Sequence, residues 1–220
     1  MLKRFSSKVI SNEKITEDVF LISFEKPSDF IFQAGQFLNI EVSIDGLKRM
    51  KSYSICSPPS KSTLDFCIKI VEGGKGSNIL ANASVGDEFN MIGPFGHLMF
   101  DKDAKKHVFV CAGTGIAPFY SIIHEFENVS DELVLVAGYK YNKNVLFDNE
   151  FLRLQSKHKN FTYIKAISRE FSDNQGRVQK FIPILKDATY YICGLKELVL
   201  ETKDLLESKG ITNIRVERYS

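Results

Sequence analysis

The sequence predicts two domains of different fold class, an antiparallel β domain followed by a parallel α/β domain. The first hundred residues contain short, evenly spaced β-rich segments separated by Gly, Pro, Ser and Asp, which is typical of an antiparallel barrel or sandwich. Residues 106–220 instead alternate apolar strands with amphipathic helical segments, which favours βαβ units with right-handed crossovers. A polar, charged segment at 100–106 separates the two patterns, so we place the domains at 1–102 and 103–220.

The periodicity of apolar residues predicts the individual elements. In the first domain we expect six strands and one short helix. The strands are expected at 8–10, 19–24, 37–42, 51–55, 64–71 and 88–92, and the helix at 77–83. In the second domain we expect five strands near 107–112, 132–138, 161–167, 189–193 and 212–217. The helical patterns between them lie at 118–126, 146–155, 178–185 and 196–208.

Length and composition exclude several classes of protein. The chain has 220 residues, of which 44% are hydrophobic and 25% charged, and these values are ordinary for a soluble globular protein. The net charge of +2 gives no reason to expect binding to nucleic acid or to an anionic membrane surface. No run reaches the roughly 18 apolar residues that span a bilayer. The first residues are basic but lack the apolar core of a secretory signal, so we expect a cytoplasmic protein.

The cysteines argue for a reducing compartment and against a metal cluster. Cys56, Cys67, Cys111 and Cys193 lie far apart, each in an apolar run and without C-x-x-C spacing. Such spacing suits reduced thiols in a cytosolic protein. Because an iron–sulfur cluster needs grouped thiolates, we expect neither a cluster nor another metal site on this chain.

The most informative motif is Gly113-Thr114-Gly115, which follows the apolar run 107–112 and precedes a predicted helix. Two glycines let the backbone approach a bulky anion without a Cβ in the way. The start of the helix then offers free N–H groups and the positive end of the helix dipole. We interpret this segment as a phosphate-binding turn. A plain tight turn between strand and helix is the alternative.

Three further motifs are weaker when each is taken alone. Lys51-Ser52-Tyr53-Ser54 offers an aromatic ring to a flat conjugated ligand, although a solvent-facing strand would have the same composition. Gly74-Lys75-Gly76-Ser77 is a second Gly-rich turn ahead of a short helix, hence a second candidate for phosphate, although such turns are common in hairpins. Cys193-Gly194-Leu195 ends the fourth strand of the α/β domain, at the edge where open sheets bind ligands, although cysteines are usually just buried.

The order of these motifs resembles the ferredoxin–NADP reductase family along nearly the whole chain. The family's flavin motif, Arg-x-Tyr-Ser/Thr, is similar to 51–54, and its pyrophosphate turn, Gly-x-x-Ser, is similar to 74–77. The exit from its barrel, Gly-Pro-x-Gly, is similar to 93–96. Lys51 stands where the family has arginine. An arginine holds a pyrophosphate with a planar fork and a lysine with a point charge, so Arg49 is a candidate to assist.

The C-terminal motifs of the family follow in the same order. Its nucleotide signature, Gly-Thr-Gly-Ile-Ala-Pro-Phe, matches 113–119 residue for residue, and its Cys-Gly-Leu/Pro motif matches 193–195. The Val-Glu-x-Tyr ending of plant-type members is similar to 216–219. In those members the tyrosine is the last residue and stacks on the flavin, whereas here Ser220 follows Tyr219.

The resemblance implies an N-terminal antiparallel Greek-key β-barrel that binds FAD, and a C-terminal Rossmann-like domain with five parallel strands that binds a pyridine nucleotide. It implies hydride transfer from NAD(P)H to FAD, with NADPH favoured, and electron transfer to an acceptor protein such as ferredoxin or flavodoxin. Three alternatives stay open: an NADH-dependent reductase component of an oxygenase system, a flavin electron-transfer subunit of a larger complex, and a flavin-binding regulator without nucleotide chemistry.

The resemblance also implies the roles of individual residues. At the reacting centre it implies Ser54, Cys193 and Glu217. For FAD it implies Lys51, Tyr53, Ser54, Cys67, Ile68, Lys69, Gly74, Gly76, Ser77, Thr114 and Tyr219. For the nucleotide it implies Gly113, Thr114, Gly115, Ser168, Arg169, Arg177, Cys193, Gly194 and Leu195. Arg169 and Arg177 are the cations expected at the adenosine 2′-phosphate, and solvated surface charges are the alternative for both.

Overall fold

The computed structural model describes residues 2–219, which fall into two compact units. Contacts between residues group the chain up to residue 99 with 117–125 in one unit, and 100–116 with the residues from 126 onward in the other. Helix α2 (Ala117–Glu125) therefore belongs to the first unit, whereas the limits drawn from the sequence place it in the second domain. Within the described residues, none of the helices combines the length and apolar character needed to cross a membrane.

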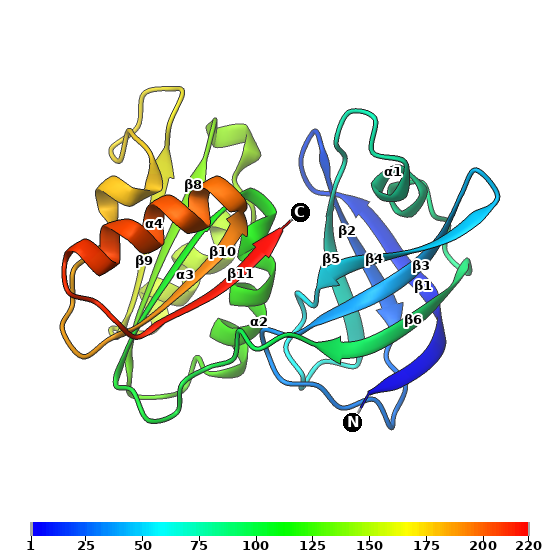
Figure 1. Cartoon of the computed structure of the whole chain (residues 1–220), viewed down its shortest axis with the longest axis horizontal. Helices are drawn as coiled ribbons and strands as arrows, with labels where there is room; N and C mark the ends of the chain where they lie inside the picture. Colours follow the sequence, from blue (N-terminus) through cyan, green and yellow to red (C-terminus); the bar gives the residue numbers. More distant parts are fainter. Residues whose placement is uncertain (1, 220) are drawn as a thin grey trace. The chain divides into compact units, whose positions relative to one another are not determined.

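The first unit is built on a six-stranded antiparallel sheet with the order β4-β3-β6-β1-β2-β5 (Figure 1). Its strands are β1 (Lys3–Lys14), β2 (Val19–Glu25), β3 (Phe37–Ile44), β4 (Leu47–Ser54), β5 (Thr63–Lys69) and β6 (Glu88–Phe95). Helix α1 (Lys75–Ala81) follows β5. Alternating side chains such as Leu38, Ile40 and Val42 of β3 face a common apolar core, because successive side chains of a strand point to opposite faces.

The two ends of this sheet are joined by the segment that follows β4. The backbone N–H of Cys56 donates to the Asp65 carbonyl of β5 at 2.7 Å, and the Asp65 N–H donates to Ser57 Oγ at 3.0 Å. These bonds use backbone groups that an edge strand would otherwise leave exposed. The sheet therefore curves into a half-barrel, and the predicted antiparallel barrel is confirmed in place of a sandwich.

Strand β1 is much longer than the predicted segment 8–10, because it pairs with two different strands. Its first half pairs with β6 from Lys3 to Lys8, and its second half pairs with β2 from Val9 to Lys14. The register shifts between Val9 and Ser11, as in a β-bulge, which bends a strand and increases its twist. Most polar residues of this strand are exposed, which hides its length from an analysis of apolar runs.

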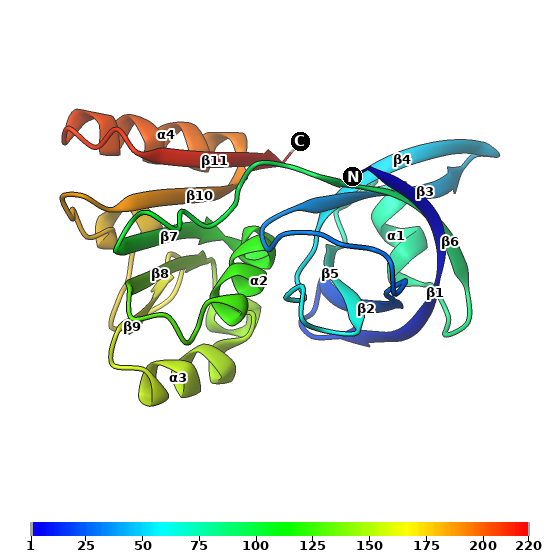
Figure 2. The same cartoon turned by 90° about the horizontal axis from the view of Figure 1, so that it is seen from below.

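The second unit is a five-stranded parallel sheet with the order β11-β10-β7-β8-β9. Its strands are β7 (Lys106–Ala112), β8 (Glu132–Tyr139), β9 (Phe161–Ile167), β10 (Thr189–Leu195) and β11 (Ile214–Tyr219). Helix α4 (Lys196–Ser208) covers one face, and helix α3 (Asp148–Lys157) lies on the other (Figure 2). Counted in chain order the strands run 5-4-1-2-3, which is five-sixths of the Rossmann order, so the predicted Rossmann-like fold is confirmed.

A short 3₁₀ turn replaces one of the predicted helices, and two others lie in connecting segments. The segment 178–185 forms only the turn η3 (Val178–Phe181), because Pro183 lacks a backbone N–H and disfavours helical geometry in the residue before it. Residues Gly113–Ile116 form the turn η1, and α2 begins at Ala117, one residue before the predicted start at 118. The remaining turn, η2 (Asn142–Asn144), follows β8.

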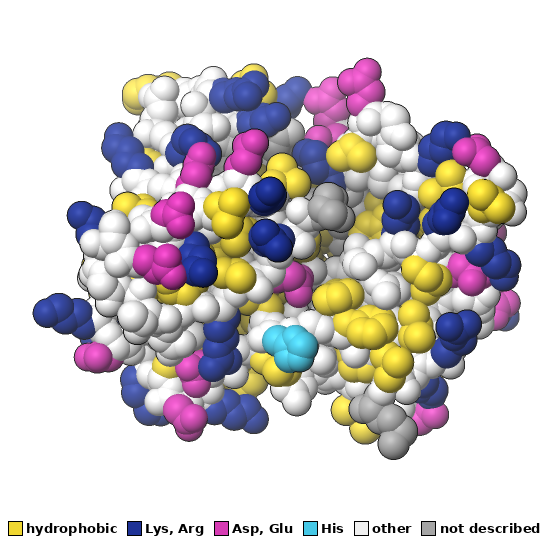
Figure 3. All heavy atoms as spheres, viewed as in Figure 1, with side chains coloured by type: hydrophobic (Ala, Val, Ile, Leu, Met, Phe, Trp, Pro, Cys, Tyr) yellow, Lys and Arg dark blue, Asp and Glu magenta, His cyan; other side chains and the backbone are white. Residues whose placement is uncertain are grey.

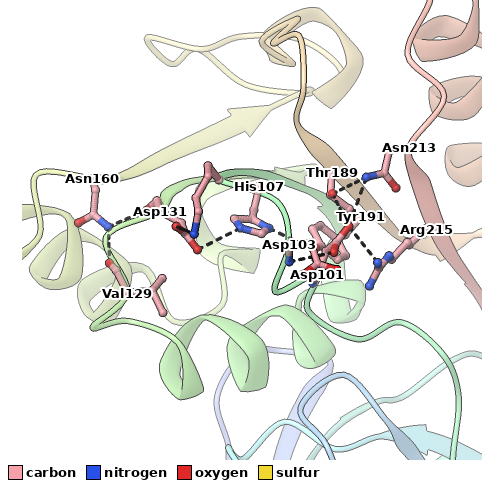
Figure 4. Close-up of polar contacts among 11 residues, drawn as sticks. Asp101, Asp103, His107, Val129, Asp131, Asn160, Thr189, Tyr191, Asn213 and Arg215 are labelled. Atoms are coloured by element: carbon pink, nitrogen blue, oxygen red, sulfur yellow. Dashed lines mark hydrogen bonds and ion pairs between the residues drawn. The ribbon is translucent and has the colours of Figure 1, made fainter.

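A hydrogen-bonded network of polar side chains fixes the amino-terminal ends of the parallel strands (Figure 4). Asp101 Oδ2 accepts hydrogen bonds from Thr189 at 2.9 Å and from Asn213 at 3.3 Å, and it forms an ion pair with Arg215 at 2.9 Å. The Asp101 N–H donates to the hydroxyl of Tyr191 at 2.9 Å. One carboxylate thus ties the segment before β7 to β10 and β11.

His107, in strand β7, extends this polar cluster. Its ring is fully buried, stacks on Phe100 with centroids 4.1 Å apart, and shares a hydrogen bond of 3.1 Å with Tyr191. Its other nitrogen lies 3.7 Å from Asp131, which also pairs with Lys105. Burial lowers the pKa of His107 below its ordinary 6.5, against the opposing charges of Asp131 and Asp101. The ring is therefore held neutral.

Acidification should destabilise the second unit through His107. The unfolded chain takes up a proton near pH 6.5, whereas the folded chain takes it up only at lower pH. The free energy of unfolding should therefore fall as the pH drops below 6.5, until the pH passes the lowered pKa. Urea unfolding followed by circular dichroism from pH 5 to 8 measures this, and His107→Gln should flatten the dependence. The matched control His97→Gln, at an exposed histidine, should leave it unchanged; equal pH dependence in wild type and His107→Gln would contradict the assignment.

Candidate functional site

In the first unit, the predicted flavin motif and the predicted pyrophosphate turn lie side by side. A Cβ placed on Gly76 would lie 3.2 Å from Cγ of Lys51 and 3.4 Å from its Cε. The side chain of Lys51 therefore runs along the start of α1, with its stem against the glycine. Lys51 is exposed, and Arg49 points to the same face of β4 two residues earlier. Lys51 thus lies along the start of the helix, and a second cation, Arg49, lies on the same face of β4 two residues away.

The turn before α1 is held by its own side chains. Gly74 donates its N–H to the Val71 carbonyl at 2.9 Å, and its carbonyl accepts from Ser77 Oγ at 3.1 Å and Asn78 Nδ2 at 2.7 Å. A Cβ at Gly74 would lie 2.4 Å from Cγ2 of Val71 and 3.0 Å from its carbonyl oxygen, so a larger residue would require the turn to shift. The geometry fits the phosphate-binding role expected of Gly74, Gly76 and Ser77.

Tyr53 and Ser54 end strand β4 in a partly apolar setting. Ser54 is buried, and Tyr53 is half-buried against the barrel core. Burial raises the pKa of Tyr53 to about 12, so its phenol is neutral at physiological pH. A neutral phenol ring can pack flat against a conjugated ligand without a charge to desolvate.

The three residues of β5 that are expected to contact FAD differ in their exposure to solvent. Cys67 and Ile68 are buried, and Lys69 is exposed and pairs with Asp18 at 2.7 Å. The sulfur of Cys67 lies 3.8 Å from that of Cys56. Because β5 is the last strand in the order of the sheet, its outer backbone edge can bond a ligand.

In the second unit, the motif 113–115 and the motif 193–195 meet at the carboxyl ends of β7 and β10. These strands are neighbours in the sheet although they are far apart in sequence. A Cβ at Gly115 would lie 2.4 Å from the carbonyl oxygen of Cys193, so the turn packs directly on the end of β10. Gly113 adopts a positive φ of 55°. This is the position where the strand order reverses, and open α/β sheets bind their ligands there.

Cys193, Glu217 and Tyr219 cluster at the same edge. Cys193 is fully buried, and Glu217 is its register partner on β11. Burial, and secondarily the charge of Glu217, raises the pKa of the Cys193 thiol, whereas its interaction with the Tyr219 hydroxyl opposes this. Tyr219 also donates its hydroxyl to the Thr114 carbonyl at 3.4 Å. The C-terminal tyrosine therefore lies against the phosphate-binding turn of its own unit. Leu195, the last residue of β10, is largely exposed.

The two arginines expected at the 2′-phosphate differ in their surroundings. Arg169 is exposed and makes no ion pair within residues 2–219, while its backbone N–H bonds to the Lys140 carbonyl at 2.9 Å. Ser168 Oγ donates to the Tyr139 carbonyl at 3.2 Å. Arg177 instead forms a two-pronged pair with Glu201 of α4, at 2.6 and 3.3 Å. Arg169 is thus the cation more available to an anionic ligand.

Comparison with known families agrees with this geometry. Residues 6–100 match the oxidoreductase FAD-binding domain family, and residues 109–204 match the oxidoreductase NAD-binding domain family. Ferredoxin–NADP reductase B of Sorangium cellulosum is 26% identical over 98% of this chain and 97% of its own length. The chain thus consists of an oxidoreductase FAD-binding domain and an oxidoreductase NAD-binding domain, and it is similar to ferredoxin–NADP reductases. It is an NAD(P)H-dependent oxidoreductase with FAD as its cofactor.

Some of the similar proteins are longer reductases. A glycine betaine monooxygenase reductase subunit of Pseudomonas aeruginosa is 34% identical over 87% of this chain, and the chain spans only 56% of that relative. Among solved structures, the ferredoxin–NADP reductase of Neisseria gonorrhoeae with bound FAD and NADP has a TM-score of 0.87, with 21% identity and 98% of both chains covered. That likeness concerns the fold.

The structure also shows site features that the sequence analysis missed. Glu201, the partner of Arg177, lies on α4, and no local pattern links the two. The carboxylate of Glu170 accepts hydrogen bonds from the backbone N–H and the side-chain amide of Asn142. A signal for this second contact exists, because Asn142 and Glu170 are polar residues that follow two successive predicted strands of the α/β domain.

Replacing Gly115 with alanine should impair nucleotide-dependent reduction without loss of FAD. The added Cβ meets a backbone carbonyl, so the turn must move away from β10. A displacement of about 1 Å can cost roughly 100-fold in rate. Stopped-flow reduction of the yellow protein measures this. The matched control Gly46→Ala strains a positive φ of 76° at the β3–β4 turn, but its Cβ comes within 4 Å of no other atom, so this variant should reduce like wild type. Wild-type rates in Gly115→Ala would show that the close approach does not matter.

Proposed function

We propose that residues 1–102 bind FAD and residues 103–220 bind NADPH, with electrons passing onward to an acceptor protein such as ferredoxin or flavodoxin. The observation that carries the proposal is the meeting of Gly113–Gly115 with Cys193–Gly194 at the point where the order of the parallel strands reverses. That juxtaposition unites a phosphate-binding turn with a buried thiol and a nearby carboxylate. A cytoplasmic location suits the four buried free thiols.

The residues of the first unit fit an FAD molecule. Lys51 would neutralise its pyrophosphate beside Gly76 and Ser77, and the outer backbone edge of Cys67–Lys69 would bond its ribityl and phosphate part. Tyr53 would flank the ring system, and the buried hydroxyl of Ser54 would hydrogen-bond near the ring atom that accepts the hydride. When bound, FAD supplies the acceptor of a hydride from the nicotinamide and the store from which electrons leave.

Cys193 acts in this scheme as a neutral packing group. Its raised pKa keeps it a thiol, so it is a poor nucleophile and no covalent intermediate is proposed. Its soft sulfur would pack against the nicotinamide, held by the close turn at Gly115. Glu217, next to it on β11, would polarise or exchange protons at the same place. Thr114 and Tyr219 would complete the site around the nucleotide.

The preference for NADPH rests on Arg169. Its guanidinium is exposed and makes no ion pair within the described residues, beside Ser168 at the carboxyl end of β9. A planar guanidinium matches a phosphate better than any other side chain does. Arg177 would assist if Glu201 released it.

Arg169→Ala should raise the Michaelis constant for NADPH far more than that for NADH. A charge-assisted hydrogen bond to phosphate is worth about 1.5–3 kcal/mol, or roughly 10- to 150-fold. Steady-state kinetics with both nucleotides measures the two constants. Arg153→Ala, an exposed arginine on α3, is the matched control and should change neither. Small, equal effects of Arg169→Ala on both nucleotides would show that this arginine does not read the 2′-phosphate.

Cys193→Ser and Glu217→Gln should slow the reduction of FAD by roughly 10-fold or more, which corresponds to about 1.4 kcal/mol of transition-state stabilisation. Serine keeps the size of the thiol but adds a hydroxyl that needs hydrogen bonds, and glutamine removes the charge of Glu217. Both variants should stay yellow and folded. Stopped-flow absorbance with excess NADPH gives the rates, and near wild-type rates in both variants would place these residues outside the reacting centre.

The proposal and its alternative differ in the protein that accepts the electrons. The match to two ferredoxin–NADP reductases covers more than nine-tenths of each relative, which supports ferredoxin or flavodoxin. The similarity to reductase components of oxygenases supports an NADH-dependent role in such a system. On the face drawn in Figure 3, Lys and Arg are interspersed with Asp and Glu, so that face offers no extended patch of one sign. Reduction of cytochrome c with and without added ferredoxin or flavodoxin tests the proposed acceptor.

A further inference from the structure

Helix α2 is joined to the first unit by a buried hydrogen bond between segments far apart in the sequence. Ser121 Oγ donates to the backbone carbonyl of Ser57 at 2.8 Å, and neither residue is more than 1% exposed. A serine inside a helix can instead bond a carbonyl one turn earlier. Here the hydroxyl reaches a carbonyl 64 residues away, so this bond holds the helix against another segment.

The segment that accepts this bond is itself held against β5. Ser57 Oγ accepts a hydrogen bond from the Asp65 N–H at 3.0 Å and donates one to the Thr63 carbonyl at 2.9 Å. The Cys56 N–H donates to the Asp65 carbonyl at 2.7 Å. Ser57 lies only three residues after Ser54, the residue proposed to lie beside the reacting atom of FAD. The carbonyl that anchors α2 therefore belongs to a fixed continuation of the flavin motif.

Apolar contacts hold the same helix more broadly. Its buried residues are Ala117, Pro118, Phe119, Ser121, Ile122 and Ile123. A Cβ added to Gly35 would lie 3.0 Å from Cδ1 of Ile122, which shows how closely the helix packs on the first unit. Apolar attraction has no preferred direction, whereas a hydrogen bond weakens steeply when its angle changes. The bond from Ser121 is therefore a contact that sets the position of α2 along its axis.

The start of α2 is continuous with the proposed phosphate-binding turn. Turn η1 ends at Ile116 and α2 begins at Ala117, so no residue between them has a non-helical conformation. Gly115 of this turn packs directly on the carbonyl of Cys193. A shift of α2 along its axis would therefore displace the turn, and with it the nucleotide that the turn is proposed to bind.

We propose that Ser121 is a positioning residue for hydride transfer, because it fixes the helix that leads from the nucleotide-binding turn to the segment after Ser54. The inference rests on the proposed roles of Ser54 and of 113–115, and Ser121 acts through the backbone rather than by contact with either ligand. In the reaction, the C–H bond at C4 of the nicotinamide breaks and its hydride passes with both electrons to the FAD ring. The nucleotide is thereby oxidised and FAD is reduced. Displacing the donor by about 1 Å can slow such a step roughly 100-fold.

The experiment compares Ser121→Ala, which removes the donor, with Ser121→Cys, which keeps a side chain of similar size but a weaker donor. The matched control is Ser7→Ala in β1. Ser7 is 3% exposed and donates to the Glu25 carbonyl at 2.6 Å, so both alanine variants lose a buried bond of the same kind. Stopped-flow reduction over a range of NADPH concentrations separates the limiting rate from the dissociation constant of the nucleotide. Flavin content and urea unfolding are measured for each variant.

Ser121→Ala should lower the limiting rate by roughly 10- to 100-fold, at an unchanged dissociation constant for NADPH and with full flavin content. Ser121→Cys should give an intermediate rate. Ser7→Ala should lose stability in urea and yet reduce at the wild-type rate, because its bond lies outside the connection between the flavin motif and α2. A structural role alone would lower stability in both serine-to-alanine variants without this difference in rate.

Wild-type limiting rates in both Ser121 variants would overturn the inference. An equal loss of rate in Ser7→Ala would also overturn it, because the slowing would then follow from lower stability. If Ser121→Ala does not retain FAD, the rate of Ser121→Cys decides between the same outcomes. Wild-type protein that neither NADPH nor NADH reduces would instead overturn the proposed function, which is a separate result.

Discussion

The close approach of Gly115 to the carbonyl of Cys193 is the contact on which the nucleotide site depends. An ideal Cβ at Gly115 would lie only 2.4 Å from that oxygen, so no residue larger than glycine fits without movement. The contact joins the turn after β7 to the end of β10, two segments that are separated by about eighty residues. It exists because β10 inserts beside β7 at the point where the strand order reverses, which leaves room for a ligand above both strand ends.

The amino ends of the parallel strands carry structural contacts, and their carboxyl ends carry the proposed binding residues. At the amino ends, the partly buried Asp101 and the buried His107 and Tyr191 form a hydrogen-bonded cluster that ties strands together. At the carboxyl ends, glycines, a buried thiol and exposed side chains such as Arg169 are presented instead. A buried cluster stabilises only when its polar groups are paired, whereas a binding edge must keep some groups unpaired until its ligand arrives. The same five strands meet both demands because the two sets lie at opposite ends.

The sequence predicts both fold classes and most element positions, because apolar periodicity and glycine turns are local signals. Helix 196–208 coincides with α4, and the five parallel strands lie within two residues of their predicted positions. Local signals do not predict features that depend on pairing with residues far away in the sequence. Strand β1 extends over twelve residues because two different strands pair with its polar length. The pairing of Arg177 with Glu201 and the anchoring of Glu170 by Asn142 likewise depend on segments that only the fold brings together.

Anaerobic reduction of the purified yellow protein, with NADPH and NADH in parallel and the flavin absorbance as readout, tests the central claim most directly. That claim is that this chain passes a hydride from a nicotinamide nucleotide to its FAD, with NADPH preferred. The account predicts that both nucleotides bleach the flavin band and that NADPH does so faster at limiting concentration. Absence of bleaching by either nucleotide would contradict the account as a whole, and faster bleaching by NADH would contradict the assignment of Arg169 to the 2′-phosphate.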